Sequence, residues 1–302
     1  MHRSGSLVWA VATPEQTAMT ILRSAREMRA TSRAFRAADE QIALVPTMGY
    51  LHEGHLSLVR KAVAVCKRVV VSIYVNPTQF GENEDLDTYP RGLAKDVERV
   101  MDIGADVVFA PDDETIYPAG YATYVTVTKV TNGLCGTSRP THFRGVTTVV
   151  SKLFNIVEPD IAIFGEKDYQ QLAVIRRMVA DLNFPIEILG MPIVREPDGL
   201  AMSSRNVHLS HPQRKAATAL NRTLRAVRDL YNQGQRDPVK LVSLAEAMIA
   251  SEPELTPDYL ELIDPDSLDP LNNVVTLPES VHMALAVFAG DTRLIDNLRI
   301  SE

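Results

Sequence analysis

The sequence predicts an α/β fold, in which a Rossmann-like parallel sheet carries helices on both faces and is followed by a smaller α+β domain with an antiparallel sheet. Two patterns predict this fold. Between residues 42 and 182, short apolar or β-branched runs alternate with segments of helical apolar spacing, which is typical of β-α-β units. Beyond residue 250, short apolar runs follow one another without intervening helices, which indicates antiparallel pairing.

The first pattern gives the elements of the parallel domain in order. A short segment and a polar helix occupy residues 19–40. Strands are then expected at residues 42–46, 68–75, 106–110, 123–128 and 161–165. Helices are expected at residues 55–67, 92–103, 145–157 and 168–182. The carboxyl ends of parallel strands meet at one edge of a sheet, where ligands bind. The residues that follow four of the strands should therefore lie together at that edge: Gly49, Asn76, Pro111 and Gly165.

The pattern changes near residue 190. We expect a boundary there between a first domain, residues 1–190, and a second domain, residues 191–302. Residues 1–18 show no clear period and are interpreted as a loose extension. The second domain is expected to contain two long helical stretches, at residues 211–233 and 238–250. Its strands are expected at residues 259–263, 274–277, 281–288 and 292–300.

Composition limits the classes of function. The 302 residues carry a formal net charge of −7, which argues against a general nucleic-acid or membrane-surface binder. No apolar run approaches the roughly 18 residues that a membrane-spanning helix needs. The two cysteines, Cys66 and Cys135, lie far apart and form no CxxC pattern, so we expect neither a disulfide scaffold nor a cysteine zinc site. A cytoplasmic protein that acts on small molecules is the resulting expectation.

The motif His52-Glu53-Gly54-His55 stands between the first long strand and the helix after it. Backbone N–H groups are unsatisfied at a helix N-terminus and the helix dipole favours anions there, so two imidazoles at this point suit a phosphate. A zinc protease motif needs its two histidines four residues apart within a helix, whereas these are three apart at a helix start. Two unrelated surface histidines are the alternative, but the Pro-Thr-Met-Gly run before the motif makes it the less favoured one.

Two further stretches carry charged and hydroxyl side chains. Lys167 leaves the end of a buried strand as a compact positive charge that suits a triphosphate, and Gln171 lies about one helical turn later. The run from residue 202 to residue 205 offers two serine hydroxyls and the permanent cation of Arg205. Taken alone, the first stretch also fits a capped helix with a surface lysine, and the second fits a plain polar loop.

A strand followed by His-x-Gly-His resembles the nucleotidyltransferase superfamily, which includes class I aminoacyl-tRNA synthetases, small nucleotidylyltransferases and the pantothenate synthetase family. Five stretches together resemble this last family in order and spacing, over the chain from about residue 20 to the C-terminus. They are residues 46–49, 75–80, 139–145, 165–168 and 202–206. An aminoacyl-tRNA synthetase is disfavoured by the length and acidity of the chain.

The resemblance implies an ATP-dependent ligase that condenses pantoate with β-alanine. The product is pantothenate, the intermediate is a pantoyl adenylate, and AMP and pyrophosphate are released. It also implies Mg²⁺, a homodimer, and lids at residues 76–90 and 202–206. A nucleotidylyltransferase of the same superfamily, acting on a phosphorylated substrate, is the alternative.

Roles for individual residues follow from the same resemblance. The catalytic set would be His52, His55, Lys167, Ser203, Ser204 and Arg205. Gln79 and Gln171 would bind pantoate and β-alanine. The ATP site would comprise Met48, Gly49, Tyr50, Leu51, His52, Glu53, Gly54, His55, Gly165, Glu166, Lys167, Asp168, Val194, Met202, Ser203, Ser204 and Arg205. The metal ligands stay open, with Asp96 as a candidate. Cys135 is expected to be a small buried residue near the site, without a catalytic role.

Overall fold

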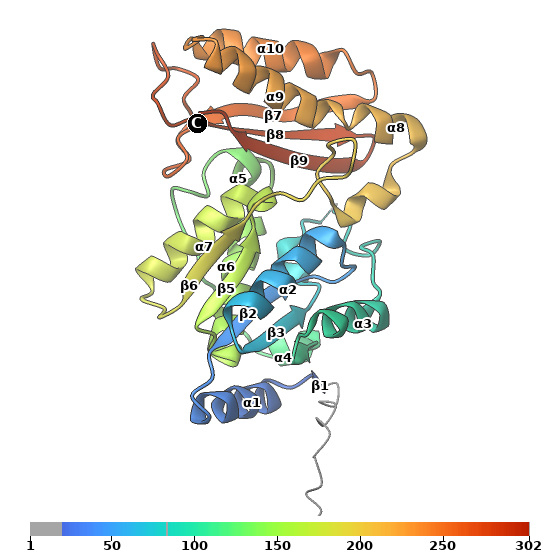
Figure 1. Cartoon of the computed structure of the whole chain (residues 1–302), viewed down its shortest axis with the longest axis vertical. Helices are drawn as coiled ribbons and strands as arrows, with labels where there is room; N and C mark the ends of the chain where they lie inside the picture. The colour runs from blue at the N-terminus through green and yellow to red at the C-terminus, as the bar shows by residue number, and fades with distance from the viewer. Residues whose placement is uncertain (1–19, 83, 302) are drawn as a thin grey trace, which may run out of the picture.

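A six-stranded parallel sheet forms the N-terminal part of the computed structural model, which describes residues 20–82 and 84–301 (Figure 1). The strand order is β1-β4-β3-β2-β5-β6, and each neighbouring pair is parallel. The strands are β1 (Thr20–Leu22), β2 (Ile42–Thr47), β3 (Arg68–Ile73), β4 (Val107–Phe109), β5 (Ile161–Gly165) and β6 (Glu187–Met191). The extension predicted at residues 1–18 lies outside the described residues.

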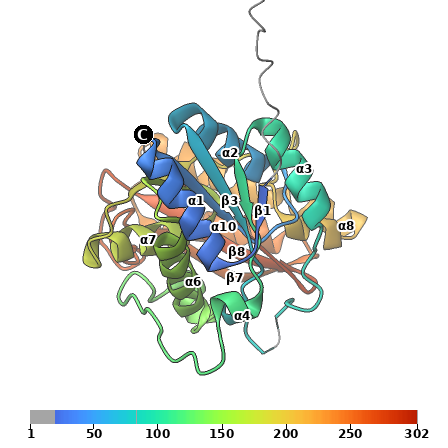
Figure 2. The ribbon, with the colours of Figure 1, turned by 90° about the horizontal axis from the view of Figure 1, so that it is seen from below.

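Helices cover both faces of this sheet, as predicted (Figure 2). They are α1 (Ala25–Ala37), α2 (Glu53–Val65), α3 (Leu93–Ile103), α6 (His142–Val157) and α7 (Tyr169–Asp181). Because side chains alternate across a strand, Ala43 and Val45 pack with α2 and α3, whereas Ile42 and Leu44 pack with α1, α6 and α7. Each face therefore has its own apolar core, and every residue of the central strand β2 from 42 to 45 is buried.

The strand order reverses at β2, which has β3 on one side and β5 on the other. At such a reversal, the loops at the carboxyl ends of the two adjacent strands diverge and leave a crevice that ligands occupy. The loop after β2 contains the two histidines, and the loop after β5 contains Lys167. The topology therefore places both predicted motifs on opposite sides of one crevice.

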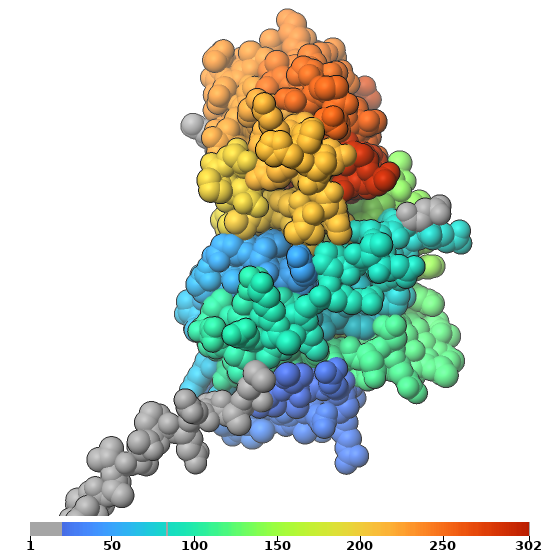
Figure 3. Space-filling view, turned by 90° about the vertical axis from the view of Figure 1, so that its right-hand side faces the viewer, coloured from blue at the N-terminus to red at the C-terminus, as the bar shows by residue number. Residues whose placement is uncertain are grey.

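The C-terminal part contains an antiparallel sheet of β7 (Leu255–Ile263), β8 (His282–Ala289) and β9 (Thr292–Arg299). The helices α9 (Ala219–Asn232) and α10 (Pro238–Ala250) bury their apolar stripes against one face of it. The opposite face is turned toward α5 (Leu134–Ser138) and the carboxyl edge of the parallel sheet (Figure 1). In the space-filling view, the yellow and orange surface of this part rests on the blue and teal surface of the N-terminal part (Figure 3).

Three sequence predictions about elements are wrong. Residues 123–128 form no strand, because the backbone N–H and C=O of Val125 bond to the hydroxyls of Thr148 and Thr147 on α6. Residues 274–277 also form no strand, and Val275 is 96% exposed. The long helix predicted at residues 211–233 is divided by a turn at residues 217–218 into α8 (His211–Ala216) and α9.

Apart from the short 3-10 helices, four elements of the described residues have no counterpart among the strands and helices predicted from the sequence. They are β1, β6 and the short helices α4 (Asp113–Ile116) and α5. β6 occupies the stretch interpreted as a domain boundary, and it completes the parallel sheet at Met191. The division of the chain at residue 190 stays a prediction. None of the helices within residues 20–82 and 84–301 is long and apolar enough to cross a membrane.

Candidate active site

A cleft with two connected cavities lies at the carboxyl edge of the parallel sheet. The inner cavity, of about 220 Å³, lies among the loops that follow β2, β3, β5 and β6. The outer cavity, of about 600 Å³, lies between those loops and the antiparallel sheet. The two share the lining residues Arg139, His142, Lys167, Asp168, Gln171, Ser203 and Arg205. They therefore form one continuous site.

The two motif histidines sit at the N-terminus of α2, and His52 is its N-cap. The Nδ1 atom of His52 accepts from the backbone N–H of Gly54 at 3.2 Å, and the Nδ1 atom of His55 accepts from the backbone N–H of His52 at 3.4 Å. Since both Nδ1 atoms accept, each neutral ring carries its proton on Nε2. A Cβ at Gly54 would lie 2.9 Å from the His52 ring, so glycine is required for this arrangement.

Burial lowers the pKa of both imidazoles. It brings the pKa of His55 to about 4, with a further contribution from the nearby charge of Lys167. It brings the pKa of His52 to about 3, with contributions from His55 and Lys167. Both rings are therefore neutral near pH 7, and they offer N–H donors rather than positive charges to a ligand.

The loop between β2 and α2 is held by Asp96 on α3. Its Oδ2 accepts from the backbone N–H of Tyr50 at 2.6 Å, and its Oδ1 accepts from the backbone N–H of Leu51 at 2.8 Å. Asp96 is 3% exposed, and the guanidinium of Arg99 donates to the carbonyl of Leu51. Asp96, the candidate metal ligand, has both carboxylate oxygens engaged in this way. Asp96 therefore anchors this loop, and its candidacy as a metal ligand stays a prediction.

Gln79 ends the 3-10 helix η1 (Pro77–Gln79), just after β3, and lines the inner cavity. Its Oε1 accepts from Asn76 Nδ2 at 2.9 Å, so its own amide N–H groups are the donors left for a ligand. The backbone of η1 lies directly against α6, and a Cβ at Gly145 would lie 2.3 Å from the carbonyl oxygen of Thr78. Glycine at this position lets the helix approach the loop and bring Gln79 into the cleft.

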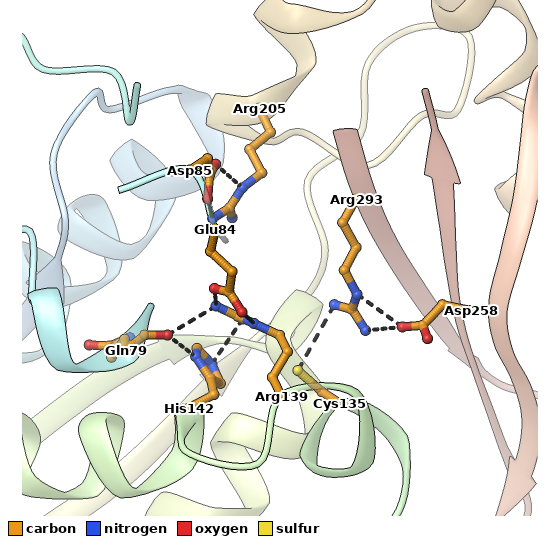
Figure 4. Close-up of polar contacts among 9 residues, drawn as sticks. All are labelled: Gln79, Glu84, Asp85, Cys135, Arg139, His142, Arg205, Asp258 and Arg293. Atoms are coloured by element: carbon orange, nitrogen blue, oxygen red, sulfur yellow. Dashed lines mark hydrogen bonds and ion pairs between the residues drawn. The ribbon is translucent and has the colours of Figure 1, made fainter. Parts of the chain in front are cut away.

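The two stretches expected to be lids contact each other over the cleft (Figure 4). Arg205 forms a bidentate ion pair with Asp85, at 2.7 and 2.9 Å. The hydroxyls of Tyr89 and Ser204 lie 3.3 Å apart. Beside them, Arg139 pairs with Glu84 and also donates to the backbone carbonyl of Gln79 at 3.0 Å. The loop after β3 is thus tied both to the serine loop and to Arg139 at the C-terminus of α5.

Comparison with known proteins decides which reaction this site serves. Residues 20–299 match the model of the pantoate–β-alanine ligase family. The chain belongs to this family. Pantothenate synthetases from Geobacter sulfurreducens and Heliobacterium modesticaldum are each 54% identical to it, over 94% and 93% of this chain and 99% of their own lengths.

Solved structures of the pantoate–β-alanine ligase family have the same fold. The crystal structure of pantothenate synthetase from Thermus thermophilus superposes with a TM-score of 0.88 and 44% identity, over 94% of this chain and 100% of that one. The Francisella tularensis pantoate–β-alanine ligase was solved in complex with β-γ ATP and β-alanine. It superposes with a TM-score of 0.77 at 33% identity, over 94% of this chain and 98% of that one. This chain is accordingly a ligase that forms pantothenate, rather than the alternative nucleotidylyltransferase.

Most residues predicted for this ligase site line the inner cavity together. They are Met48, His52, Gly54, His55, Gln79, Gly165, Lys167, Asp168, Gln171, Val194, Met202, Ser203, Ser204 and Arg205. Five predicted residues do not line either cavity: Gly49, Tyr50, Leu51, Glu53 and Glu166. Tyr50 and Leu51 instead hold the loop through Asp96, and Glu53 pairs with Arg60. The chemical roles of all these residues stay predictions.

Several residues of the ligase cleft had no role assigned from the sequence. Arg139 and His142 belong to a stretch that matched the family, and the charged side chain of Arg139 is the signal that could have singled it out. Tyr89 and Arg293 had no such local signal, because only the folded chain brings them to the cleft. Cys135 is half-buried in the outer cavity, with its Sγ 3.9 Å from Arg293 Nη1.

Proposed function

We propose that this ligase joins pantoate to β-alanine in two steps at the inner cavity, with ATP as the co-substrate. A carboxylate is a poor electrophile, because attack by an amine would have to expel oxide. In the first step, a pantoate carboxylate oxygen attacks the α-phosphorus of ATP, the bond to the bridging oxygen breaks, and pyrophosphate leaves. In the second step, the β-alanine amine attacks the acyl carbon, AMP leaves with the bonding pair, and the amine loses a proton.

The observation that carries this proposal is the pairing of two donor-rich loops across the strand-order reversal. On one side, the neutral His52 and His55 present N–H donors at a helix N-terminus. On the other side, Lys167 is close enough to lower the pKa of both rings. Preorganised donors and a cation are the groups that stabilise the charge growing on departing pyrophosphate.

The closing loop supplies further groups for this first step. Ser203 and Ser204 offer hydroxyls, and Arg205 offers a second cation, although its guanidinium is paired with Asp85. When the nucleotide enters, the guanidinium would bind a phosphate in place of this carboxylate, or would bind both groups.

Gln79 and Gln171 are the residues proposed to position the acyl half of the reaction. Both line the inner cavity, and Gln171 also lines the outer one. Amide groups suit the hydroxyls and carboxylate of pantoate, since each can donate and accept. The outer cavity adjoins them and is the route by which β-alanine would reach the adenylate. Holding the pantoyl group and β-alanine close together in the reactive orientation would supply much of the rate acceleration.

The Mg²⁺ predicted from the sequence would enter with the nucleotide and be held mainly by phosphate oxygens. Within residues 20–82 and 84–301, no group of three or more His, Cys, Asp and Glu side chains could hold a metal ion. The protein side chains therefore do not form a metal site of their own there, and no step of the proposal depends on one.

Pantoate-dependent exchange of labelled pyrophosphate into ATP tests the proposal. We expect exchange only when pantoate is present, and stoichiometric AMP release when β-alanine is added. Lys167→Ala should reduce exchange by roughly 100- to 1,000-fold, with little change in the pantoate KM, because the lysine acts on departing phosphate charge. Lys240→Ala, at an exposed position on α10, is the control. Exchange that does not require pantoate, or a Lys167→Ala variant with normal single-turnover adenylation, would refute the assignment.

The assembly and location of this ligase are also proposals. The family resemblance supports a homodimer in the cytoplasm. Sedimentation equilibrium of the purified protein should then give twice the mass of the 302-residue chain. A mass equal to one chain, at micromolar concentration, would contradict the dimer.

A further inference from the structure

Asn297, on strand β9 of the antiparallel sheet, reaches across to the loop that contains Lys167. Its Nδ2 donates to the backbone carbonyl of Glu166 at 3.0 Å and to that of Lys167 at 2.9 Å. Asn297 is 5% exposed, so these bonds lie in the interface between the two parts of the chain. One side chain of the C-terminal sheet therefore satisfies two successive carbonyls of the η2 turn (Glu166–Asp168).

The orientation of the Asn297 amide is fixed by His282 on the neighbouring strand β8. Since Nδ2 faces two carbonyl oxygens, Oδ1 must face the other way, where it lies 2.9 Å from His282 Nε2. His282 must then carry its proton on Nε2. Burial lowers the pKa of His282 to about 4, and the ring is neutral near pH 7. A flipped amide would place N–H groups against the imidazole N–H and an oxygen against two carbonyls.

Tyr169 connects this pair to the helix that follows Lys167. Its ring stacks on the His282 ring, with centroids 3.9 Å apart and planes at 13°. Its hydroxyl donates to the carbonyl of Pro265 at 2.9 Å. Tyr169 is the first residue of α7, so both ends of the short segment from Glu166 to Tyr169 are held by the C-terminal part.

The residue before Asn297 holds a second loop of the cleft. Asp296 is fully buried as a side chain and forms a bidentate ion pair with Arg195, at 2.6 and 2.9 Å. Arg195 lies next to Val194 of the inner cavity and pairs through a β-bridge with Ala201, directly before the closing loop. Of these two adjacent residues of β9, Asn297 therefore holds the loop of Lys167 directly, and Asp296 holds Arg195, which is bridged to Ala201 before the closing loop.

We propose that Asn297 is a positioning residue for Lys167 and that His282 orients its amide. The antiparallel sheet then acts in the first step by fixing the backbone from which the Lys167 side chain extends. This inference rests on the role proposed above for Lys167. A displacement of about 1 Å at a reacting group can cost on the order of 100-fold in rate. Loss of the two hydrogen bonds from Asn297 should therefore lower the turnover rate measurably.

The test uses the full-length enzyme and pantoate-dependent pyrophosphate exchange. Asn297→Ala should lower the exchange rate roughly 10- to 100-fold and leave the pantoate KM within about twofold. His282→Phe keeps a ring against Tyr169 but removes the donor to Asn297, and it should give a smaller loss in the same direction. Asn273→Ala, at an exposed position of the same part, is the matched control.

A double-mutant cycle with Lys167→Ala separates positioning from a general structural role. If Asn297 acts through Lys167, adding Asn297→Ala to Lys167→Ala should cost less than threefold more in exchange rate. If the double variant loses as much exchange rate as the product of the two single losses, the proposal is overturned. Normal exchange in folded Asn297→Ala would also overturn it. If Asn297→Ala does not fold, His282→Phe is taken through the same cycle with the same criterion. Absence of pantoate-dependent exchange in the unmodified enzyme would instead refute the proposed function.

Discussion

At the scale of single residues, the protonation of the two motif histidines determines what they can do. A phosphate site is commonly built from positive charges, and a pair of histidines in such a site suggests two charged imidazolium rings. Here the two rings are buried together, 4.1 Å apart between centroids, and next to Lys167, so a charge on either is costly. In the proposed reaction the site would thus separate two tasks: the histidines would donate hydrogen bonds as neutral rings, and Lys167 and Arg205 would supply charge.

Asp96 gives a prediction at the same scale, because a loop anchor and a metal ligand respond differently to mutation. In Asp96→Asn, one carboxylate oxygen becomes an NH₂ group that faces a backbone N–H. We expect a loss of about 1–3 kcal/mol in the free energy of unfolding, and a fall in pyrophosphate exchange as His52 shifts. Urea unfolding and exchange assays measure the two effects.

The control for this anchor is Asp102→Asn, an exposed change on the same helix, which should leave both quantities unchanged. Raising the Mg²⁺ concentration should not restore exchange in Asp96→Asn. Recovery of wild-type exchange at high Mg²⁺ would mean that Asp96 binds metal after all.

At the scale of elements, the strand–loop–helix units were recognisable because apolar periodicity and loop chemistry agree. The loops after β2 and β5 both begin at a buried strand end and lead into a helix, and the prediction located both. The edge strands were not recognised. β1 has three residues and β6 is only partly buried, so neither shows the continuous apolar run of a central strand. Conversely, the β-branched run at residues 123–128 forms no strand, and the backbone of Val125 bonds to threonine hydroxyls of α6 instead.

The contact between the two lid loops leads to a prediction about shielding of the intermediate. Asp85→Ala breaks the bidentate pair with Arg205 and removes one tie between the loops. A less closed cleft admits water to the adenylate. We therefore expect the rate of AMP release without β-alanine to rise several-fold relative to the rate of pantothenate formation with β-alanine. Measuring AMP in the first reaction and pantothenate in the second gives this ratio.

Asp87→Ala, an exposed change on the same loop, serves as the control for shielding and should leave the ratio unaltered. An unchanged ratio in Asp85→Ala would show that the ion pair does not contribute to closure.

At the scale of the whole molecule, the parallel sheet and the C-terminal part have separate apolar cores. Two clusters flank the parallel sheet, and a third is formed only by residues from 200 onward. A small fourth cluster joins the two parts, with Leu134 from one side and Ile263, Leu268 and Ala284 from the other. Further contacts between the parts are polar, and they include the bonds of Asn297 to the loop of Lys167 and the ion pair of Arg205 with Asp85. The cleft is therefore assembled from both parts.

The buried histidines predict how the stability of the whole molecule depends on pH. Burial lowers the pKa of His55, His142 and His282 to about 4 and that of His52 to about 3. In the unfolded chain they titrate near 6.5. Between pH 6.5 and 4 the unfolded state therefore binds more protons, and the free energy of unfolding falls as the pH falls. Each such histidine contributes up to about 1.4 kcal/mol per pH unit.

Urea unfolding at pH 7, 6 and 5 measures this dependence. Most of the loss should appear below pH 6.5, and the exposed change His208→Asn should leave the profile unaltered. Equal stability at pH 7 and pH 5 would contradict the buried, neutral state of these rings.

The sequence by itself determined the fold class and the motifs of the site, because strand and helix periodicity and the loop residues are local properties of the chain. It also contained the family resemblance. Only the tertiary structure decided the protonation of His52 and His55, the anchoring role of Asp96, and the reach of Asn297 to Lys167. These depend on burial and on contacts between residues 45 to 131 positions apart. Desolvation and long-range hydrogen bonds arise only when distant segments pack together, and no local pattern encodes them.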